Sequence, residues 1–318
     1  MKKSFYIVAI MAFVVMGCQN EDKVASAVNK INLEVKVSRF DEAFAQAEPS
    51  DIPELRKEYP YLFPAPDSVW LAKLRDSLQI ELRGEVMSEF KDFGKEKADI
   101  ELLFKYIQYY FPKFSAPRVV TVTNDVDYDN RIILTDSLLL IGLDNYLGPE
   151  HKYYQGMQKY IAQDRKREFM VSDIANAFAN KVVPKPNGRT FLDQLVYYGK
   201  KLYLKDKIMP FQSDELKINY TADELAWAQA NEEPMWRFFV EGELLYSTDN
   251  KLPLRFLDPA PFSKFGLELD NESPGRLGRY VGWQIVRSFM DKNGVTLQQL
   301  MNLSAEEIFK KSNYKPNK

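Results

Sequence analysis

The segment SPGRLGRYVGWQIVRSFM, residues 273–290, predicts a long helix that packs closely against another part of the chain. Serine followed by proline is typical of a first helical turn. Glycines at positions 275, 278 and 282 leave a groove along such a helix, and a neighbouring backbone can come close to it there. We therefore expect this helix to pack in the interior, with a partner-binding groove as the alternative.

In that alternative, the large side chains beside the glycines would contact the partner, because Arg, Tyr and Trp concentrate at binding hot spots. The candidate contact residues are Arg276, Arg279, Tyr280 and Trp283.

The remainder of the chain alternates between apolar patterns of helical period and a few short strand patterns. We expect strands at residues 31–40, 119–122, 132–134 and 138–141. Helices are expected from residue 41, from residue 53, at 68–93, 95–110, 167–181 and 191–204, twice within 220–246, and at 273–290 and 304–311. Thr221 and Glu224 have capping-box spacing, and residues 252–267 predict a proline-rich loop. The fold class is therefore α+β, mainly helical with a small sheet in the N-terminal half.

The N-terminus has the features of a bacterial lipoprotein signal. Lys2 and Lys3 precede an apolar run at residues 5–16, which is shorter than the ~20 residues that span a bilayer. Gly17 and Cys18, the only cysteine, follow the run, and polar residues come directly after them. We predict a signal peptide at 1–17, a lipidated tether at 18–30 and a single globular domain at 31–318. Acyl chains on Cys18 would anchor the protein to a membrane that it does not cross.

Composition excludes several classes of site. Lys and Arg (43) nearly balance Asp and Glu (45) without a basic block, which argues against nucleic-acid binding. The single histidine, His151, excludes an H-E-x-x-H zinc helix and a three-histidine site. No G-x-S-x-G or glycine-rich phosphate loop occurs. We therefore expect no catalytic residue, cofactor or metal, and a surface or capping role for His151.

Two acidic groups have alternative interpretations. Asp125, Asp127 and Asp129 have the spacing of calcium ligands, but the sixth position lacks glycine, so a polar turn between strands is the simpler interpretation. Glu232 and Glu233 suit a helix N-terminus. We expect Arg237 and Glu241 to form an i,i+4 ion pair.

Several segments resemble one protein family along nearly the whole chain. They are residues 57–64 (KEYPYLFP), 66–70, 124–128, 199–206 (GKKLYLKD), 244–249, 259–265 and 270–276 (DNESPGR) with 282–288 (GWQIVRS). In these segments the chain resembles the GldB gliding-motility lipoproteins of the Bacteroidetes. The resemblance implies an envelope lipoprotein of the gliding and type IX secretion machinery, and it supplies no catalytic residues.

A more distant likeness is to gluzincin metallopeptidases. Residues 172–178 would correspond to the first metal-binding helix with its ligands replaced, and Glu241 to a remnant of the second. This likeness implies a degenerate zincin-like scaffold.

Three functions follow as hypotheses. The first is a non-catalytic, lipid-anchored component of the cell envelope that binds other proteins of the gliding or secretion machinery. The second is a peptidase-like or cell-wall hydrolase that acts through carboxylates, with Glu241 as a candidate. The third is a glycan-binding surface lipoprotein that uses exposed tryptophans. The sequence leaves open which membrane and leaflet hold the anchor.

Overall fold

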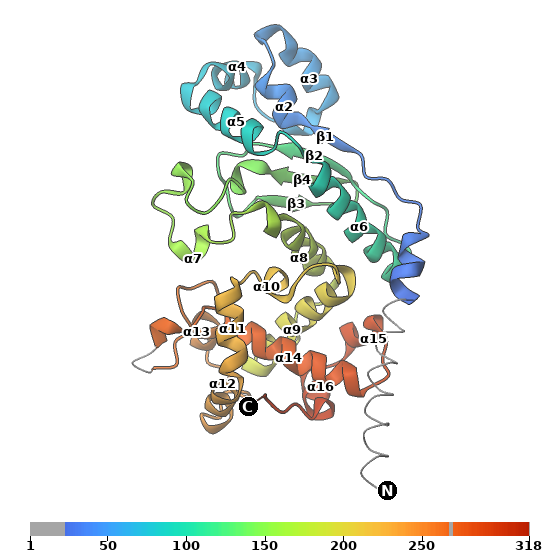
Figure 1. Ribbon diagram of the computed structural model, residues 1–318, viewed down its shortest axis with the longest axis vertical. Coiled ribbons are helices and arrows are strands. Elements are labelled where there is room, and N and C mark those ends of the chain that lie inside the picture. The colour runs from blue at the N-terminus through green and yellow to red at the C-terminus, as the bar shows by residue number, and fades with distance from the viewer. Residues whose placement is uncertain (1–22, 267–269, 318) are drawn as a thin grey trace, which may run out of the picture.

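The computed structural model describes residues 23–266 and 270–317. It is mainly helical, with a four-stranded sheet in the N-terminal half, which confirms the predicted fold class. Figure 1 shows helices α2–α5 at one end, the sheet next to them, and helices α9–α16 at the other end. The predicted signal peptide and Cys18 lie outside the described residues.

The sheet has the strand order β1-β2-β4-β3, from Val37–Arg39, Arg118–Val122, Leu138–Gly142 and Ile132–Leu134. β2 pairs in parallel with both β1 and β4, and β3 pairs antiparallel with β4. The predicted strand at 31–40 is wrong for residues 31–36, which form no ladder. Their alternating pattern nevertheless buries Val35 between the exposed Glu34 and Lys36.

Side chains alternate between the two faces of the sheet, as the pleat requires. Val120 and Leu140 face a small core made by α2 (Phe40–Ala45), α3 (Ile52–Glu58) and α4 (Asp67–Arg75). Val119, Leu139 and Ile141 face the main core, which continues into the helical half. The sheet therefore separates two hydrophobic layers.

The predicted helix at 68–93 is two helices, α4 and α5 (Ser77–Glu89). Asp76 interrupts it with an extended backbone, and its side chain accepts a hydrogen bond from the Gln79 amide, which starts α5. Asp favours such N-caps because it satisfies an otherwise unpaired helical N–H.

The other helices follow the predicted order with shifted ends. They are α6 (Gly94–Tyr110), α7 (Lys159–Ala162), α8 (Met170–Val182), α9 (Phe191–Ile208), α10 (Asp214–Ile218), α11 (Ala222–Ala230), α12 (Glu232–Glu241), α13 (Lys251–Phe256), α14 (Leu277–Lys292), α15 (Leu297–Asn302) and α16 (Ala305–Ser312). Thr221 forms the predicted capping box at α11. The predicted loop at 252–267 is wrong where α13 forms, and the sequence patterns did not predict α7, α10 or α15.

Helices α9 and α14 are packed along each other in the helical half, and their glycines permit the contact. A Cβ on Gly282 would lie 1.9 Å from the Leu195 carbonyl oxygen, and one on Gly199 would lie 2.1 Å from the Gly282 oxygen. The packing role predicted for the glycine stripe is thus confirmed at Gly282. The helix begins at Leu277 rather than at residue 273, because Arg276 has a left-handed backbone (φ 62°).

Residues 23–29 are helical, and Val28 is fully buried in the main core. The core therefore includes a residue on the N-terminal side of the predicted domain boundary at Ile31.

Candidate functional site

A cavity of about 580 Å³ lies where the sheet half meets the helical half. Its walls come from the segment after β2, from β3, α7 and α8 on one side, and from α9, α10 and the start of α14 on the other. Charged side chains line it unevenly: Asp129, Asp164 and Asp173 against Arg131, Arg165, Lys201, Lys205, Lys217, Arg276 and Arg279.

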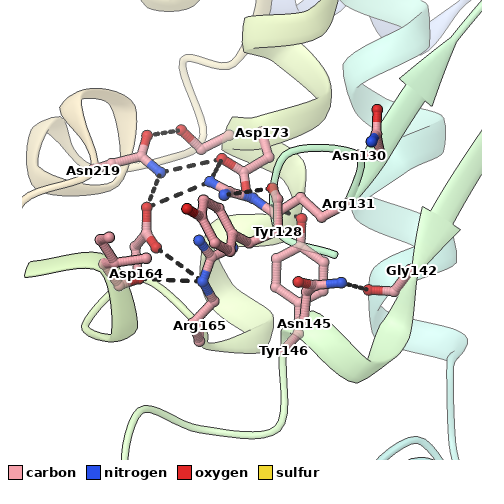
Figure 2. Close-up of polar contacts among 12 residues, drawn as sticks. Tyr128, Asn130, Arg131, Gly142, Asn145, Tyr146, Asp164, Arg165, Asp173 and Asn219 are labelled. Atoms are coloured by element: carbon pink, nitrogen blue, oxygen red, sulfur yellow. Dashed lines mark hydrogen bonds and ion pairs between the residues drawn. The ribbon is translucent and has the colours of Figure 1, made fainter. Parts of the chain in front are cut away.

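The paired wall, defined by Arg131, Asp164, Arg165 and Asp173, is a hydrogen-bonded network (Figure 2). Arg131 donates from Nε to Asp173 Oδ2 at 2.6 Å and from Nη2 to Asp173 Oδ1 at 2.9 Å. The hydroxyl of Tyr146 donates to the same carboxylate at 2.9 Å. Burial alone would raise the pKa of Asp173, but the charge and hydrogen bonds of Arg131 outweigh it and lower the pKa. Asp173 is therefore an ionised, fully engaged carboxylate.

Arg165 fills the space beside this pair and is only 2% exposed. Its Nε donates to the Ile161 carbonyl at 3.1 Å, and its guanidinium stacks on Tyr128 with 5.2 Å to the ring centroid. The nearest carboxylate oxygen, on Asp164, is 3.8 Å from Nε. Burial, followed by the charge of Arg131, lowers the pKa of Arg165. Its Nη1 atom has no hydrogen-bond partner within residues 23–266 and 270–317.

The unpaired wall, defined by Lys201, Lys205, Arg276 and Arg279, lies on α9 and at the start of α14. Within the described part of the chain, none of the four forms an ion pair. Lys205 donates instead to Ser172 Oγ at 2.9 Å and to the Lys217 carbonyl at 2.8 Å.

Burial dominates the electrostatics of this wall. It lowers the pKa of Lys201 to about 8, with a further contribution from the charge of Arg279. It lowers the pKa of Lys205 to about 7, although the charge of Asp173 acts in the opposite direction. It lowers the pKa of Arg279 to about 10, helped by Arg276. Lys201, Lys205 and Arg279 thus lie in a desolvated environment in which neighbouring like charges lower their pKa values further, and the wall can stabilise a negative charge placed among them.

Neighbouring carboxylates are already engaged by other cations. Asp206 and Asp214 both bind Arg287 through two hydrogen bonds each, and both contact Lys217. Lys217 is therefore neutralised although it lines the cavity, whereas Lys201 and Lys205 have no ion pair within residues 23–266 and 270–317.

The predicted contact residues of the 273–290 segment divide into two pairs. Arg276 and Arg279 line the cavity. Tyr280 is 3% exposed and Trp283 is fully buried, so the expectation that these two contact a partner is wrong. Trp283 donates to Asp206 and lies under the guanidinium of Arg287, which fixes it inside the helix pair.

His151 is a cap, as predicted. Its Nδ1 accepts from the Tyr153 amide at 3.4 Å, and its Nε2 lies 3.6 Å from a Glu85 oxygen.

The acidic segment at 125–129 forms a turn whose carboxylates face different partners. Asp125 binds Lys73 and Gln79, whereas Asp127 accepts from the Asn130 side chain. Buried Asp144 accepts from the amides of Asn124 and Val126, which holds the left-handed backbone at Asp125 and Val126. The polar-turn interpretation therefore accounts for these residues.

Glu232 and Glu233 occupy the first turn of α12, as predicted. Arg237 pairs with Glu233 at 2.6 Å, so the predicted Arg237–Glu241 pair is wrong. Glu232 is 1% exposed and accepts from Tyr280 and Tyr314, a buried role that the sequence did not indicate.

The proposed remnant of a metal-binding helix does reach the cavity. Asp173 and Asn176 on α8 line it, while Glu241 is exposed at the end of α12 and is not part of the lining. Among the described residues, no group of three His, Cys, Asp or Glu side chains is arranged to hold a metal ion. The gluzincin likeness therefore remains a prediction.

A sequence model of the family described as gliding motility protein GldB matches residues 21–316. The chain belongs to the GldB family. Membership implies a gliding-motility lipoprotein associated with the cell envelope. No curated protein and no solved structure matches the chain. Within residues 23–266 and 270–317, no helix has the length and apolarity needed to cross a bilayer.

Two of the segments that resemble the GldB family, 199–206 and 270–276, supply Lys201, Lys205 and Arg276 to the cavity. Sequence reasoning singled out Arg276 and Arg279 but missed the two lysines and the Arg131–Asp173 pair. One signal was available: Lys201 and Lys205 are one turn apart on the same helix face, within a helix whose other residues are largely apolar.

Proposed function

We propose that this GldB-family protein is a lipid-anchored component of the gliding-motility and type IX secretion machinery, and that it acts by binding other proteins of the machinery without catalysis. Cys18 is the proposed attachment site for the lipid. Family membership supports the motility role, and the lipoprotein signal at residues 1–18 supports the anchor.

The observation that carries the non-catalytic part of the proposal is the state of Asp173. It is the carboxylate on α8 that faces the cavity, and it accepts from Arg131, Tyr146 and Asn219. A general base needs a free lone pair and a pKa near the working pH. Asp173 has neither, because Arg131 holds it ionised and its oxygens are occupied.

Cross-linking in living cells, followed by capture of the full-length protein, tests the proposal. We expect gliding or secretion proteins to be recovered with the wild type from the membrane fraction. The Cys18→Ser variant should leave that fraction and fail to support motility. Wild-type protein that captures no envelope protein, or a Cys18→Ser variant that stays at the membrane, would contradict it.

The hydrolase hypothesis is tested at Glu241. This side chain forms no ion pair or side-chain hydrogen bond within the described part of the chain, so Glu241→Gln should leave both stability and motility unchanged. Loss of motility in a folded Glu241→Gln protein would instead favour catalysis.

The glycan hypothesis loses its stated basis. All four tryptophans are buried or half-buried: Trp70, Trp227, Trp236 and Trp283. Each indole is therefore at least partly covered by the protein, which argues against the stacking of a sugar ring on it.

A further inference from the structure

The two lysines of the unpaired wall are buried and its two arginines are half-buried, yet none of the four forms an ion pair within residues 23–266 and 270–317, an arrangement that proteins ordinarily avoid. An isolated charge in an apolar environment costs several kcal/mol unless it is paired or loses its proton. Lys201 is only 8% exposed, and its ammonium has no hydrogen-bond or ion-pair partner within residues 23–266 and 270–317. It lines the cavity together with Arg279, whose like charge makes its position still less favourable.

The guanidiniums of this wall are held in place by groups that leave donors free. Arg279 stacks on Tyr198, with 4.3 Å to the ring centroid, and among the residues that the structure describes it donates only its Nε, to the Leu257 carbonyl. Arg276 stacks on Tyr220 at 5.3 Å and donates one Nη2 hydrogen bond, to the Asn219 carbonyl. A stacked guanidinium keeps its edge available for in-plane hydrogen bonds. Both arginines are therefore fixed in advance, with unused N–H groups.

We propose that the cavity binds a small anion that carries a phosphoryl group, with Lys201, Arg276 and Arg279 as its direct ligands. Lys205 also lines the cavity and uses two of its three ammonium donors on protein oxygens, so one donor is left for the anion.

Because several cations line one wall, we expect an anion that carries more than one negative charge and more than two acceptor oxygens. A single carboxylate carries one charge and two acceptor oxygens, whereas a phosphoryl dianion offers three oxygens and suits both Arg forks and Lys point charges. Arg131 engages Asp173 and also contacts Asp164, and within the described residues neither carboxylate forms an ion pair with Lys201, Lys205, Arg276 or Arg279.

The cavity is large enough for a ligand bigger than inorganic phosphate. Its volume of about 580 Å³ is in the range of small-molecule sites. Tyr160, Asn176 and Asn180 provide neutral polar and aromatic surface on the opposite side, which suits a hydroxylated group attached to the phosphate. Sugar phosphates and glycerol phosphates share this chemistry, the latter also as a lipid headgroup.

Thermal unfolding of the full-length protein in non-ionic detergent tests the inference. The probes are inorganic phosphate, glucose 6-phosphate, glycerol 3-phosphate and succinate, each compared with sodium chloride at the same ionic strength. We expect at least one organic phosphate, present well above its Kd, to raise the Tm by about 2–4 °C, and succinate to have a smaller effect. The ranking of the two organic phosphates distinguishes a sugar from a lipid-headgroup source.

Lys201→Met is the decisive variant, and Lys200→Met is its matched control. Lys200 is the adjacent residue on α9, equally buried, but it donates to the Met301 and Leu303 carbonyls and does not line the cavity. We expect Lys201→Met to abolish the phosphate-induced shift and Lys200→Met to keep it.

Two outcomes would overturn the inference. One is that no phosphate compound raises the Tm beyond the salt control. The other is that Lys201→Met responds as the wild type does. Neither result bears on the role in the machinery, because binding is measured on the purified protein and partner capture in cells.

Discussion

Both walls of the central cavity carry basic side chains, but only the paired wall also carries carboxylates that bind them. On the paired wall, Arg131 meets Asp173 through two short hydrogen bonds. On the unpaired wall, Lys201 and Arg279 face the same space and form no ion pair with any described residue. The comparison shows that burial of a charge has two meanings here. A buried ion pair fixes the structure. A buried charge without a partner lowers the stability of the folded protein but remains available to bind a ligand of opposite charge.

The largest effect is expected from breaking the paired wall. Arg131→Met leaves Asp173 buried and ionised without its counter-charge, so the free energy of unfolding should fall by about 3–5 kcal/mol. Urea denaturation measures this loss. The control is Arg237→Met, which removes an exposed ion pair with Glu233 and should cost less than about 0.5 kcal/mol. Similar losses for the two variants would mean that the paired wall is not structural.

A second, smaller loss is expected from the helix contact that supports the unpaired wall. Gly282→Ala places a Cβ against the Leu195 carbonyl, so α9 and α14 must separate, at a cost of about 1–3 kcal/mol. The separation should also move Lys201 relative to Arg279 and weaken the response to phosphate. Gly84→Ala is the control, because a Cβ there meets nothing within 4 Å. Alanine favours the helix α5, so the free energy of unfolding should rise by roughly 0.5–1 kcal/mol. A Gly282→Ala protein as stable as the wild type would refute the close packing.

An effect of opposite sign is expected at Lys201. Lys201→Met removes a buried cation that lies over the Tyr197 and Tyr198 rings but has no hydrogen bond or ion pair among the described residues, so the free energy of unfolding without phosphate should rise by about 1 kcal/mol. Lys200→Met should instead lower it by roughly 1–3 kcal/mol, because two carbonyls lose their donor. Denaturant titration of both proteins gives the comparison. A Lys201→Met protein that is less stable than the wild type would show that the ammonium stabilises the folded state.

The smallest expected effect is the pH dependence of the stability that Lys201→Met adds. The pKa of Lys201 is about 8 in the folded protein and near 10.5 when unfolded, so the unfolded state binds more protons between these values. The loss of wild-type stability that comes from burying the charged Lys201 is complete below about pH 8, and it disappears as the pH rises toward 10.5. The advantage of Lys201→Met should therefore be largest at pH 7 and shrink by pH 10. The charged neighbours Arg276, Arg279, Lys205 and Asp173 are present in both proteins, so an advantage that is constant with pH would exclude titration of Lys201.

Local signals in the sequence predicted the elements well where short-range physics controls them. The capping box at Thr221, the helix predicted at 95–110 and observed as α6, and the glycine at 282 all depend on near neighbours or on the absence of a side chain. The predictions that were wrong depended on the surroundings. Arg237 has carboxylates at both Glu233 and Glu241, and only the three-dimensional structure shows that it pairs with Glu233.

The candidate site was the least predictable part. The sequence pattern indicates Arg276 and Arg279 as contact residues for a protein partner, whereas in the structure both line the cavity. Arg131 and Asp173 are 42 residues apart, and nothing near either residue in the chain indicates the other.

The sequence by itself determined the helical character, the small sheet, the close helix contact and membership of the GldB family, because period, capping and residue size are local properties. Which charges are neutralised was decided only by the tertiary structure. A lysine on a helix is the same residue whether it meets water, a carboxylate or a cavity. Its energy depends on burial and on partners brought from distant segments, and folding alone left Lys201 beside Arg279 rather than beside an aspartate.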